Sequence, residues 1–444
     1  MEQVLIKAAQ LILSLSILVI LHEFGHYFFA RLFKTRVEKF YLFFDPWFSL
    51  FKVKKGDTEY GIGWLPLGGY VKISGMIDES MDKEAMAQEP QPWEFRSKKP
   101  YQRLLIMIGG VLMNFILAFV IYISILWAWG SEYLPTESLK YGIMVNEEGE
   151  NIGFQNGDKI LSVDGQYIED FYKILPTVVL DKAPNIEVLR DGEKVKIEIS
   201  DEHLVPLIKG EVAVTPRLFA KFSVAKVNKD SPAELGGLKK GDRIVEVNGQ
   251  GFEFYDQLTS AIRNHKNEPV ALQIERDGQP QTLDLTVASD GTLGFYPEFD
   301  KEATAYLVTK TINYTLAQSI PAGIKKGVNT VKDYLKQFKL IFSPKTKAYE
   351  SLGGFISIGN IFPGAWDWHA FWNMTAFLSI ILGVMNLLPI PALDGGHVTF
   401  LLFEMITGRK PGEKFLEYAQ ITGMIILLAL VLFANANDII KLFK

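Results

Sequence analysis

Residues 22–26 of the chain are His22-Glu23-Phe24-Gly25-His26, and they lie inside an apolar segment that covers about 4–33. Residues four apart on a helix share one face, so the imidazoles of His22 and His26 can point at one metal ion. Glu23 then lies beside that ion, where a carboxylate can take the proton of a bound water. A lone His-x-x-x-His pattern is more often a coincidence of packing, but the adjacent Glu23 and the apolar surroundings favour a metal site.

Four apolar segments are each long enough to cross a membrane, which takes ~20 helical residues. They cover about 4–33, 104–130, 371–393 and 418–437. A buried core helix would explain any one of them but not all four. The first could also be a signal peptide, yet its apolar run is too long, it contains Glu23 and Arg31, and no small-residue cleavage site follows. The sequence therefore predicts a polytopic α-helical membrane protein with four transmembrane helices.

Charge is distributed unevenly along the chain. Residues 131–300 contain 18 Lys and Arg against 30 Asp and Glu, whereas the whole chain has a net charge of only −5. Basic residues follow the first apolar segment, precede the second and separate the third from the fourth. The positive-inside rule then places 34–103 and 409–415 in the cytoplasm, with 131–300 and both termini on the outer side. The chain has no cysteine, which excludes thiolate ligands, and its acidic balance argues against binding to nucleic acid.

An internal repeat lies between the second and third apolar segments. The sequence GDKILSVDG at 157–165 recurs as GDRIVEVNG at 241–249, and Arg190-Asp191-Gly192 recurs as Arg276-Asp277-Gly278. This spacing predicts two copies of one module, each of about 84 residues. Alternating apolar residues before the Asn-Gly and Asp-Gly pairs predict short strands that are closed by tight turns.

The second copy resembles the PDZ family in Ser231-Pro232-Ala233-Glu234-Leu235-Gly236-Gly237-Leu238 and in Leu293-Gly294-Phe295, which is similar to the PDZ ligand loop of the circularly permuted bacterial form. The first copy departs from this pattern at 153–156 and at 210–212. PDZ modules add an extended peptide to a sheet edge, so the resemblance implies capture of a substrate or partner. A rigid spacer is the alternative role for the pair.

Two further segments have a recognisable pattern. Residues 60–73 are rich in Gly, aromatic and β-branched residues, which predicts a small sheet whose backbone approaches another group closely. Residues 328–342 have apolar side chains on one helical face and lysines on the other. This amphipathic helix could lie on the membrane surface next to acidic lipid, or it could pack against the repeat modules.

A tetrahedral zinc site needs a third protein ligand, and the third apolar segment offers one. The segment ends as Asn386-Leu387-Leu388-Pro389-Ile390-Pro391-Ala392-Leu393-Asp394-Gly395-Gly396-His397. Two prolines interrupt the helical hydrogen bonds and are expected to open the helix there. Asp394 and Asn386 are then polar groups near membrane depth, where they need a function or a partner. Asp394 could also be a carboxylate at the interface, and His397 an interfacial group or a ligand.

The histidine motif and the Asn386 to Gly395 motif together resemble those of the site-2 protease family of intramembrane zinc metalloproteases. The two PDZ-like modules, together with Pro66-Leu67-Gly68-Gly69-Tyr70-Val71-Lys72, are most similar to its bacterial subfamily of regulator of sigma-E proteases. The resemblance covers nearly the whole chain. One departure lies at Phe355, where related sequences often have proline, so no role is assigned to that segment.

The resemblance implies that His22, His26 and Asp394 bind Zn²⁺, that Glu23 is the general base and that Asn386 holds the substrate backbone. The strand formed by Gly68, Gly69, Tyr70, Val71 and Lys72 is then expected to bind the extended substrate. The expected activity is cleavage of single-span membrane proteins during regulated intramembrane proteolysis. Expected substrates are anti-sigma factors and remnant signal peptides, and the expected location is the bacterial inner membrane, with the active site toward the cytoplasm and the PDZ pair outside as a size filter.

Two other functions stay open at this point. One is a membrane-anchored zinc peptidase with an aqueous site on the outer side, and the other is a PDZ scaffold without catalysis. The predicted divisions of the chain, in order, are a first transmembrane helix, a cytoplasmic loop with a membrane-associated sheet, a second transmembrane helix, two PDZ modules, a linker with the amphipathic helix, and two further transmembrane helices. Their ranges are 1–33, 34–103, 104–130, 131–217, 218–300, 301–370, 371–408 and 409–444.

Overall fold

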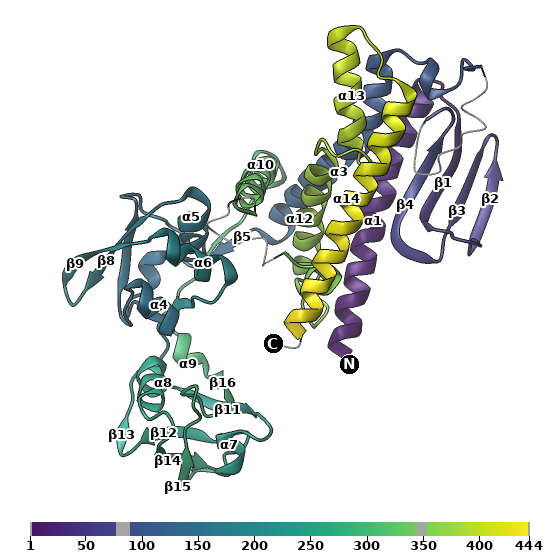
Figure 1. The fold of residues 1–444 in the computed structure, drawn as a ribbon. Helices are drawn as coiled ribbons and strands as arrows, with labels where there is room; N and C mark the ends of the chain where they lie inside the picture. The colour runs from purple at the N-terminus through teal and green to yellow at the C-terminus, as the bar shows by residue number, and fades with distance from the viewer. Residues whose placement is uncertain (1, 77–88, 342, 344–351, 443–444) are drawn as a thin grey trace. The chain divides into compact units, whose positions relative to one another are not determined.

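The computed structural model describes residues 2–76, 89–341, 343 and 352–442, and these form two compact units (Figure 1). The helical unit is made of the described parts of Met1–Ser131, Asn313–Phe338 and Leu352–Lys444. The modular unit is made of those of Glu132–Ile312 and Lys339–Ser351. Each unit is described by itself.

The helical unit contains the helices that can cross a membrane. Its helices are α1 (Glu2–Leu32), α3 (Pro100–Trp129), α10 (Leu316–Ile341, in this unit up to Phe338), α11 (Phe355–Asn360), α12 (Trp368–Asn386), α13 (Asp394–Thr407) and α14 (Glu413–Leu442), with a 3-10 turn η1 at Phe95–Ser97. Among the described residues, α1, α3, α12 and α14 are long and apolar enough to span a bilayer. The chain is therefore a multi-pass membrane protein, as the apolar segments predict.

Helix α3 contacts α1, α12 and α13 (Figure 1). Small residues permit its crossing with α1, because a Cβ atom on Gly25 would lie 2.1 Å from the carbonyl oxygen of Gly109. Buried hydroxyls connect the helices in addition. Ser379 of α12 donates to the carbonyl of Asn114 at 2.8 Å, and Thr375 bonds Ser14 of α1 at 3.0 Å. Close backbone contact and polar bonds thus fix these helices where apolar burial alone would not, since lipid is as apolar as the side chains.

The third apolar segment, predicted as 371–393, is not one continuous helix. Helix α12 ends at Asn386, and α13 begins at Asp394. Pro389 and Pro391 in between lack the amide hydrogen that a helix needs, so the chain turns there as the two prolines predict. This break lies between α12 and α13 of the helical unit, and it places Asp394 in the first turn of α13.

A four-stranded sheet follows α1. Its strands are β1 (Val37–Phe44), β2 (Phe51–Lys55), β3 (Thr58–Ile62) and β4 (Leu65–Ile73), in the order β2-β3-β1-β4. Strand β4 is antiparallel to β1, with Tyr70 opposite Tyr41, and both strands contact α1. Strands β2 and β4 are the two edges of this sheet, so one side of β4 has no neighbouring strand within it.

The modular unit contains two β-rich modules, each with its own hydrophobic core. The elements of the first are β5 (Ser131–Tyr133), η2 (Thr136–Ser138), β6 (Ile143–Val145), α4 (Glu147–Ile152), β7 (Lys159–Val163), η3 (Phe171–Lys173), α5 (Ile174–Asp181), β8 (Asn185–Arg190), β9 (Glu193–Glu198), α6 (Asp201–Lys209) and β10 (Val214–Pro216). Those of the second are β11 (Phe222–Val227), α7 (Pro232–Leu235), β12 (Arg243–Val247), β13 (Gln250–Gly251), α8 (Tyr255–Arg263), β14 (Pro269–Arg276), β15 (Gln279–Thr286) and β16 (Phe295–Phe299), followed by α9 (Lys301–Thr304) and β17 (Lys310–Ile312).

The repeated sequence motifs form the same contacts in both modules. Buried Asp158 accepts a hydrogen bond from Arg190 at 2.8 Å, and buried Asp242 accepts one from Arg276 at 2.7 Å. The Asp-Gly pairs that follow these arginines have positive φ at both residues, which is the two-residue hairpin turn that the sequence predicts. Burial alone would raise the pKa of Asp242, but the hydrogen bonds from Arg276 and from the Lys239 amide, together with the charges of both residues, outweigh burial and hold the pKa below its ordinary value.

The amphipathic helix is longer than predicted, and part of its apolar face packs against other helices. Helix α10 begins at Leu316, twelve residues before the predicted start, and Phe342 lies outside the described residues. Val331 and Tyr334 pack against α3 and α12 of the helical unit, and a Cβ atom on Gly327 would lie 2.3 Å from the Phe119 ring. Part of the apolar face of α10, at Val331 and Tyr334, is therefore covered by α3 and α12, whereas Leu335 is half exposed.

Candidate metal centre

The structure brings His22, His26 and Asp394 together from α1 and α13. The two Nε2 atoms of the histidines are 3.2 Å apart. Asp394 Oδ2 lies 3.2 Å from Nε2 of His22 and 3.3 Å from Nε2 of His26. Both histidines are buried, and the carboxylate is mostly buried. Among the described residues, these three form the group of His, Cys, Asp and Glu side chains whose ligand atoms are close enough to hold one metal ion.

The three ligand atoms fit a zinc ion. Zinc ligands lie about 2.0–2.2 Å from the metal in a tetrahedron, which separates each pair of ligand atoms by roughly 3.3 Å. The three measured separations match one face of such a tetrahedron. Asp394 Oδ2 is buried and accepts no hydrogen bond of good geometry, although both imidazoles are close to it. A buried carboxylate oxygen without a hydrogen bond is costly, and a cation in contact with it removes that cost.

The other ring nitrogens orient the two imidazoles. His26 Nδ1 lies 2.9 Å from the carbonyl oxygen of Ile106, so this nitrogen carries the proton and Nε2 keeps its lone pair. His22 Nδ1 lies 3.0 Å from the Asn114 side-chain amide, whose Oδ1 has no partner as placed. With the oxygen and nitrogen of that amide exchanged, Oδ1 accepts a hydrogen bond from His22 Nδ1, and His22 Nε2 keeps its lone pair. Both histidines then present Nε2 as a ligand, in the way that metal-binding histidines are usually held.

Gly110 of α3 provides the space for the two rings. A Cβ atom at this position would lie 2.4 Å from His26 Nε2 and 2.8 Å from His22 Nε2. Any side chain at residue 110 would therefore occupy the room of the imidazoles and of an ion between them. Helix α3 contributes no ligand to the group, yet it shapes the site through Gly110, Asn114 and the Ile106 carbonyl.

A cavity of about 910 Å³ opens onto the three ligand residues. Glu23 lines it beside His22 and His26, which places a carboxylate next to the candidate metal position. The residues that line the rest of the cavity come from β1, β4 and the start of α13, among others. They are Lys39, Phe44, Asp45, Pro46, Leu65, Gly69, Tyr70, Val71, Lys72, Ile73, Met76, Met107, Ala392, Leu393, His397 and Gln420.

Four of the five predicted β4 residues line this cavity: Gly69, Tyr70, Val71 and Lys72. Asn386, which ends α12, is not among the described residues that line the cavity. The Tyr70 hydroxyl donates to Asp45 at 2.9 Å. Burial, reinforced by that hydrogen bond, raises the pKa of Tyr70 well above its ordinary value, so the phenol stays neutral at physiological pH.

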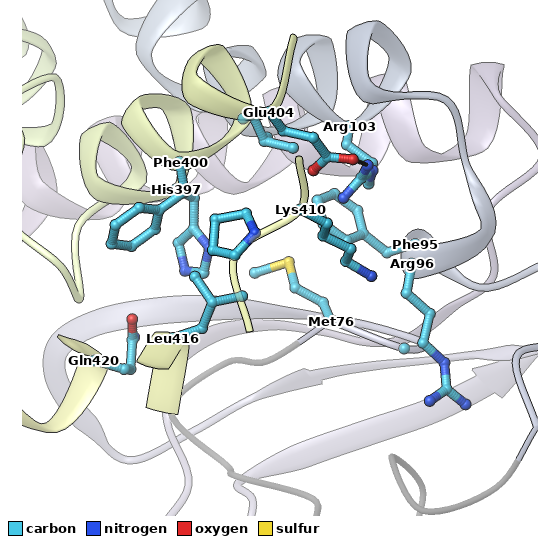
Figure 2. Close-up of a pocket in the computed structure, with 13 residues that line it drawn as sticks. Met76, Phe95, Arg96, Arg103, His397, Phe400, Glu404, Lys410, Leu416 and Gln420 are labelled. Carbon is cyan, nitrogen blue, oxygen red and sulfur yellow. Dashed lines mark hydrogen bonds and ion pairs between the residues drawn. The ribbon is translucent and has the colours of Figure 1, made fainter. Parts of the chain in front are cut away.

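A second, smaller cavity has a volume of about 70 Å³, and Figure 2 shows the residues that line it. The two cavities share Met76, His397 and Gln420. The smaller one contains the ion pair between Arg103 and Glu404, with 2.6 Å between the charged atoms. His397 lines both cavities, but it is not part of the group of candidate metal ligands.

Asn114 is the site residue that sequence reasoning missed. It lies in the apolar segment 104–130, which contains no charged residue, and it is fully buried. A strongly polar side chain at membrane depth signals a function or a partner, and that signal was present at Asn114 as it was at Asn386. The roles of Gly110 and of the Ile106 carbonyl have no such signal, because they depend on how α3 packs against α1.

Comparisons with known proteins agree with this geometry. The sequence profile of peptidase family M50 matches residues 10–430. A candidate zinc metalloprotease of Neisseria meningitidis serogroup A is 30% identical over 97% of this chain and 98% of its own length. Protease RseP of Yersinia pestis is 29% identical over the full length of both chains, and the regulator of sigma E protease of Haemophilus influenzae is 29% identical over 97% and 98%. The chain thus belongs to peptidase family M50, the site-2 proteases, and is a zinc metalloendopeptidase.

Proposed function

We propose that this protein is an intramembrane zinc endopeptidase that cleaves single-span membrane proteins. The observation that carries the proposal is the triangle of His22, His26 and Asp394, which lies on membrane-length helix α1 and on α13 and opens onto the cavity that Glu23 lines. The proposed ligands are His22 Nε2, His26 Nε2 and Asp394 Oδ2. Their separations and the unsatisfied carboxylate oxygen support this assignment.

Glu23 is the proposed general base. When bound, zinc supplies a Lewis acid for the scissile carbonyl and lowers the pKa of water. Glu23 takes the proton of the attacking water and delivers it to the nitrogen of the leaving amine. The Ile106 carbonyl and Asn114 keep His26 and His22 in the tautomers that leave Nε2 free as a ligand.

Strand β4 is the proposed binding surface for the substrate backbone. A helix buries its own peptide bonds, so a helical substrate must be extended before cleavage, and an extended segment can pair with a free sheet edge. β4 is an edge strand, and six of its residues line the cavity that contains the ligand residues. Asn386 stays a proposed contact for the substrate, with a place near the start of the loop that leads to Asp394.

The two modules of the modular unit are proposed to be PDZ modules that filter substrates by size. A cavity of about 460 Å³, lined by residues of the second module and by Met144, Val145, Asn146, Ala213 and Thr215 of the first, supports this identification. Its lining includes Leu293-Gly294-Phe295, which leads into β16, and Tyr255, Thr259 and Ile262 of α8. A groove between this loop and a helix is the arrangement expected of a PDZ peptide site. In the first module, Gly210 stands at the position that corresponds to the ligand loop of the second, and there it caps the C-terminal end of α6.

The proposed location is the bacterial inner membrane, with the metal site toward the cytoplasm. His22 lies in the last third of α1, and basic residues follow that helix, which supports this orientation. The proposed substrates are anti-sigma-factor-like proteins already trimmed on the outer side and remnant signal peptides. The name of a relative supports this class, since the Haemophilus influenzae protein is named regulator of sigma E protease.

Metal analysis combined with a cleavage assay tests the proposal. The full-length protein, Glu23→Gln and His22→Ala are purified, their zinc content is measured, and each is incubated with a tagged single-span substrate. We expect the wild type to bind zinc and cleave, Glu23→Gln to bind zinc without cleaving, and His22→Ala to lose both. Cleavage by Glu23→Gln at the wild-type rate would exclude Glu23 as the base, and full zinc content in His22→Ala would exclude the ligand set.

Accessibility mapping tests the orientation. The chain has no cysteine, so single cysteines can be placed without background. A cysteine at Lys34 should react with a membrane-impermeant reagent only when the cytoplasmic side is exposed, and one at Glu193 in the first module only from the outer side. The reverse pattern would favour the peptidase with an outward-facing aqueous site.

A further inference from the structure

The loop between α12 and α13 presents Asp394, and it contains an unfavourable backbone conformation. Ala392, two residues before Asp394, has φ of +83°, in the region that side-chain-bearing residues rarely adopt. Such a conformation persists only when surrounding contacts hold it. Within the described residues, the contacts around Ala392 therefore show what keeps the carboxylate in place.

Helix α14 provides the contact. The side chain of Gln420, which is buried, accepts a hydrogen bond from the Ala392 amide at 3.1 Å through Oε1. Gln420 also lines both cavities, and Figure 2 shows it at the edge of the smaller one, on the same side as His397. The hydrogen bond thus reaches the loop from the fourth candidate span, a helix that contributes no ligand.

A second contact comes from the same face of α14. Gly423 lies three residues after Gln420, and residues at this spacing share one helical face. A Cβ atom on Gly423 would lie 1.6 Å from the carbonyl oxygen of Pro391, the residue before Ala392. The backbone of α14 therefore touches the backbone of the loop, with no side chain between them.

We propose that Gln420, supported by Gly423, is a positioning residue that holds Pro391 and Ala392 so that Asp394 Oδ2 faces both histidines. This inference rests on the proposed zinc site. It makes the metal affinity of the protein depend on where α14 lies, because a shift of α14 away from the loop releases the Ala392 amide and lets Asp394 turn from His22 and His26. Gln420 acts through Asp394 and touches neither water nor substrate in this role.

Metal affinity of purified full-length variants tests the proposal. Gln420→Met keeps the size of the side chain but removes the acceptor, whereas Gln420→Glu keeps an acceptor oxygen. We expect Gln420→Met to bind zinc about 10–100-fold more weakly in competition with a chromogenic chelator, the range for residues that orient metal ligands. Gln420→Glu should restore most of the affinity. The cobalt-substituted protein gives a second readout, since its visible absorption reports ligand geometry and should change in Gln420→Met.

Gln10→Met is the matched control. Gln10 is a buried glutamine on α1 that donates to the Pro363 carbonyl at 2.9 Å, far along that helix from His22, so its loss should leave zinc affinity and the cobalt spectrum unchanged.

Gly423→Ala tests the contact between α14 and the loop without removing a polar group, and it serves if Gln420→Met does not fold. This variant should also bind zinc more weakly. Wild-type zinc affinity in Gln420→Met or in Gly423→Ala would overturn the proposal. Zinc retained by His22→Ala would instead overturn the site on which it rests.

Discussion

Gly110 determines whether the proposed metal centre has room to form. Its position on α3, against the rings of His22 and His26, requires a residue without a side chain. Alanine is the best helix former and glycine one of the poorest, so a glycine inside a transmembrane helix needs a reason in packing. Here that reason is the space taken by the two imidazoles.

Gly110→Ala is expected to abolish zinc binding while leaving the fold intact. The added methyl would lie within 3 Å of both Nε2 atoms and displace the rings, so we expect zinc affinity to fall by at least about 100-fold. Zinc content of the purified variant and its thermal unfolding check this. Gly359→Ala is the control, because its methyl would make an ordinary contact with Leu11 at 3.7 Å. Wild-type zinc content in Gly110→Ala would show that the site can expand.

At the residue scale, the sequence patterns pointed to residues whose side-chain type itself indicates a chemical role. His22, His26 and Asp394 meet as expected, and Glu23 lines the same cavity. Asn114 carried a signal in its polarity alone. Gly110 and the Ile106 carbonyl could not be found, because any helix offers glycines and carbonyls, and only the crossing of α1 and α3 selects these two.

Strand β4 connects the sheet to the metal centre. It pairs with β1 on one side, and residues from it line the cavity beside Glu23. If a substrate segment is held by pairing with β4, its binding depends on backbone amides of the strand more than on side chains. The side chain of Lys72 already faces Glu38, with 3.5 Å between the charged atoms.

Lys72→Pro is expected to impair cleavage while leaving the zinc content intact. Proline removes one amide donor from the strand, whereas Lys72→Ala removes the side chain and keeps the amide. Cleavage of the single-span substrate should fall at least about tenfold in Lys72→Pro and stay near wild type in Lys72→Ala, in line with the loss of a backbone hydrogen bond. Undiminished cleavage by the proline variant would argue against strand addition at β4.

The elements themselves were predictable where periodicity or turn chemistry is local. The four apolar segments, the break at Pro389 and Pro391, and the Asp-Gly hairpins all follow from the sequence. The environment of α10 does not, because its apolar face suits lipid, a module or another helix equally well. Its start at Leu316 was missed since Pro321 lies inside the helix, and proline is usually a sign of a helix end.

At the scale of the whole molecule, the proposed metal centre connects segments far apart in the chain. His22 and His26 belong to the first helix, and Asp394 belongs to α13 near the C-terminal end. A ligand that binds only the folded state stabilises it by about 4 kcal/mol when it is present at 1,000 times its Kd. Zinc bound between α1 and α13 should therefore stabilise the packing of the helical unit.

Removal of zinc is expected to lower the thermal unfolding temperature of the purified protein. The shift should be reversed by added zinc and should be absent in Asp394→Ala, which lacks one proposed ligand. Thermal unfolding in detergent, with and without chelator, measures both. An equal effect of the chelator on Asp394→Ala would mean that zinc stabilises the protein from another place.

The two edges of the small sheet differ in chemistry, and this limits the direction in which the sheet can extend. Strand β2, Phe51–Lys55, is fully exposed and contains Lys52, Lys54 and Lys55, and lysines on an open edge repel a further strand. Strand β4 lies against α1 and borders the cavity. Its edge is therefore less accessible to other protein molecules than the edge of β2. The sheet is thus protected from aggregation at its open edge, and growth by one more strand is confined to the edge beside the metal centre.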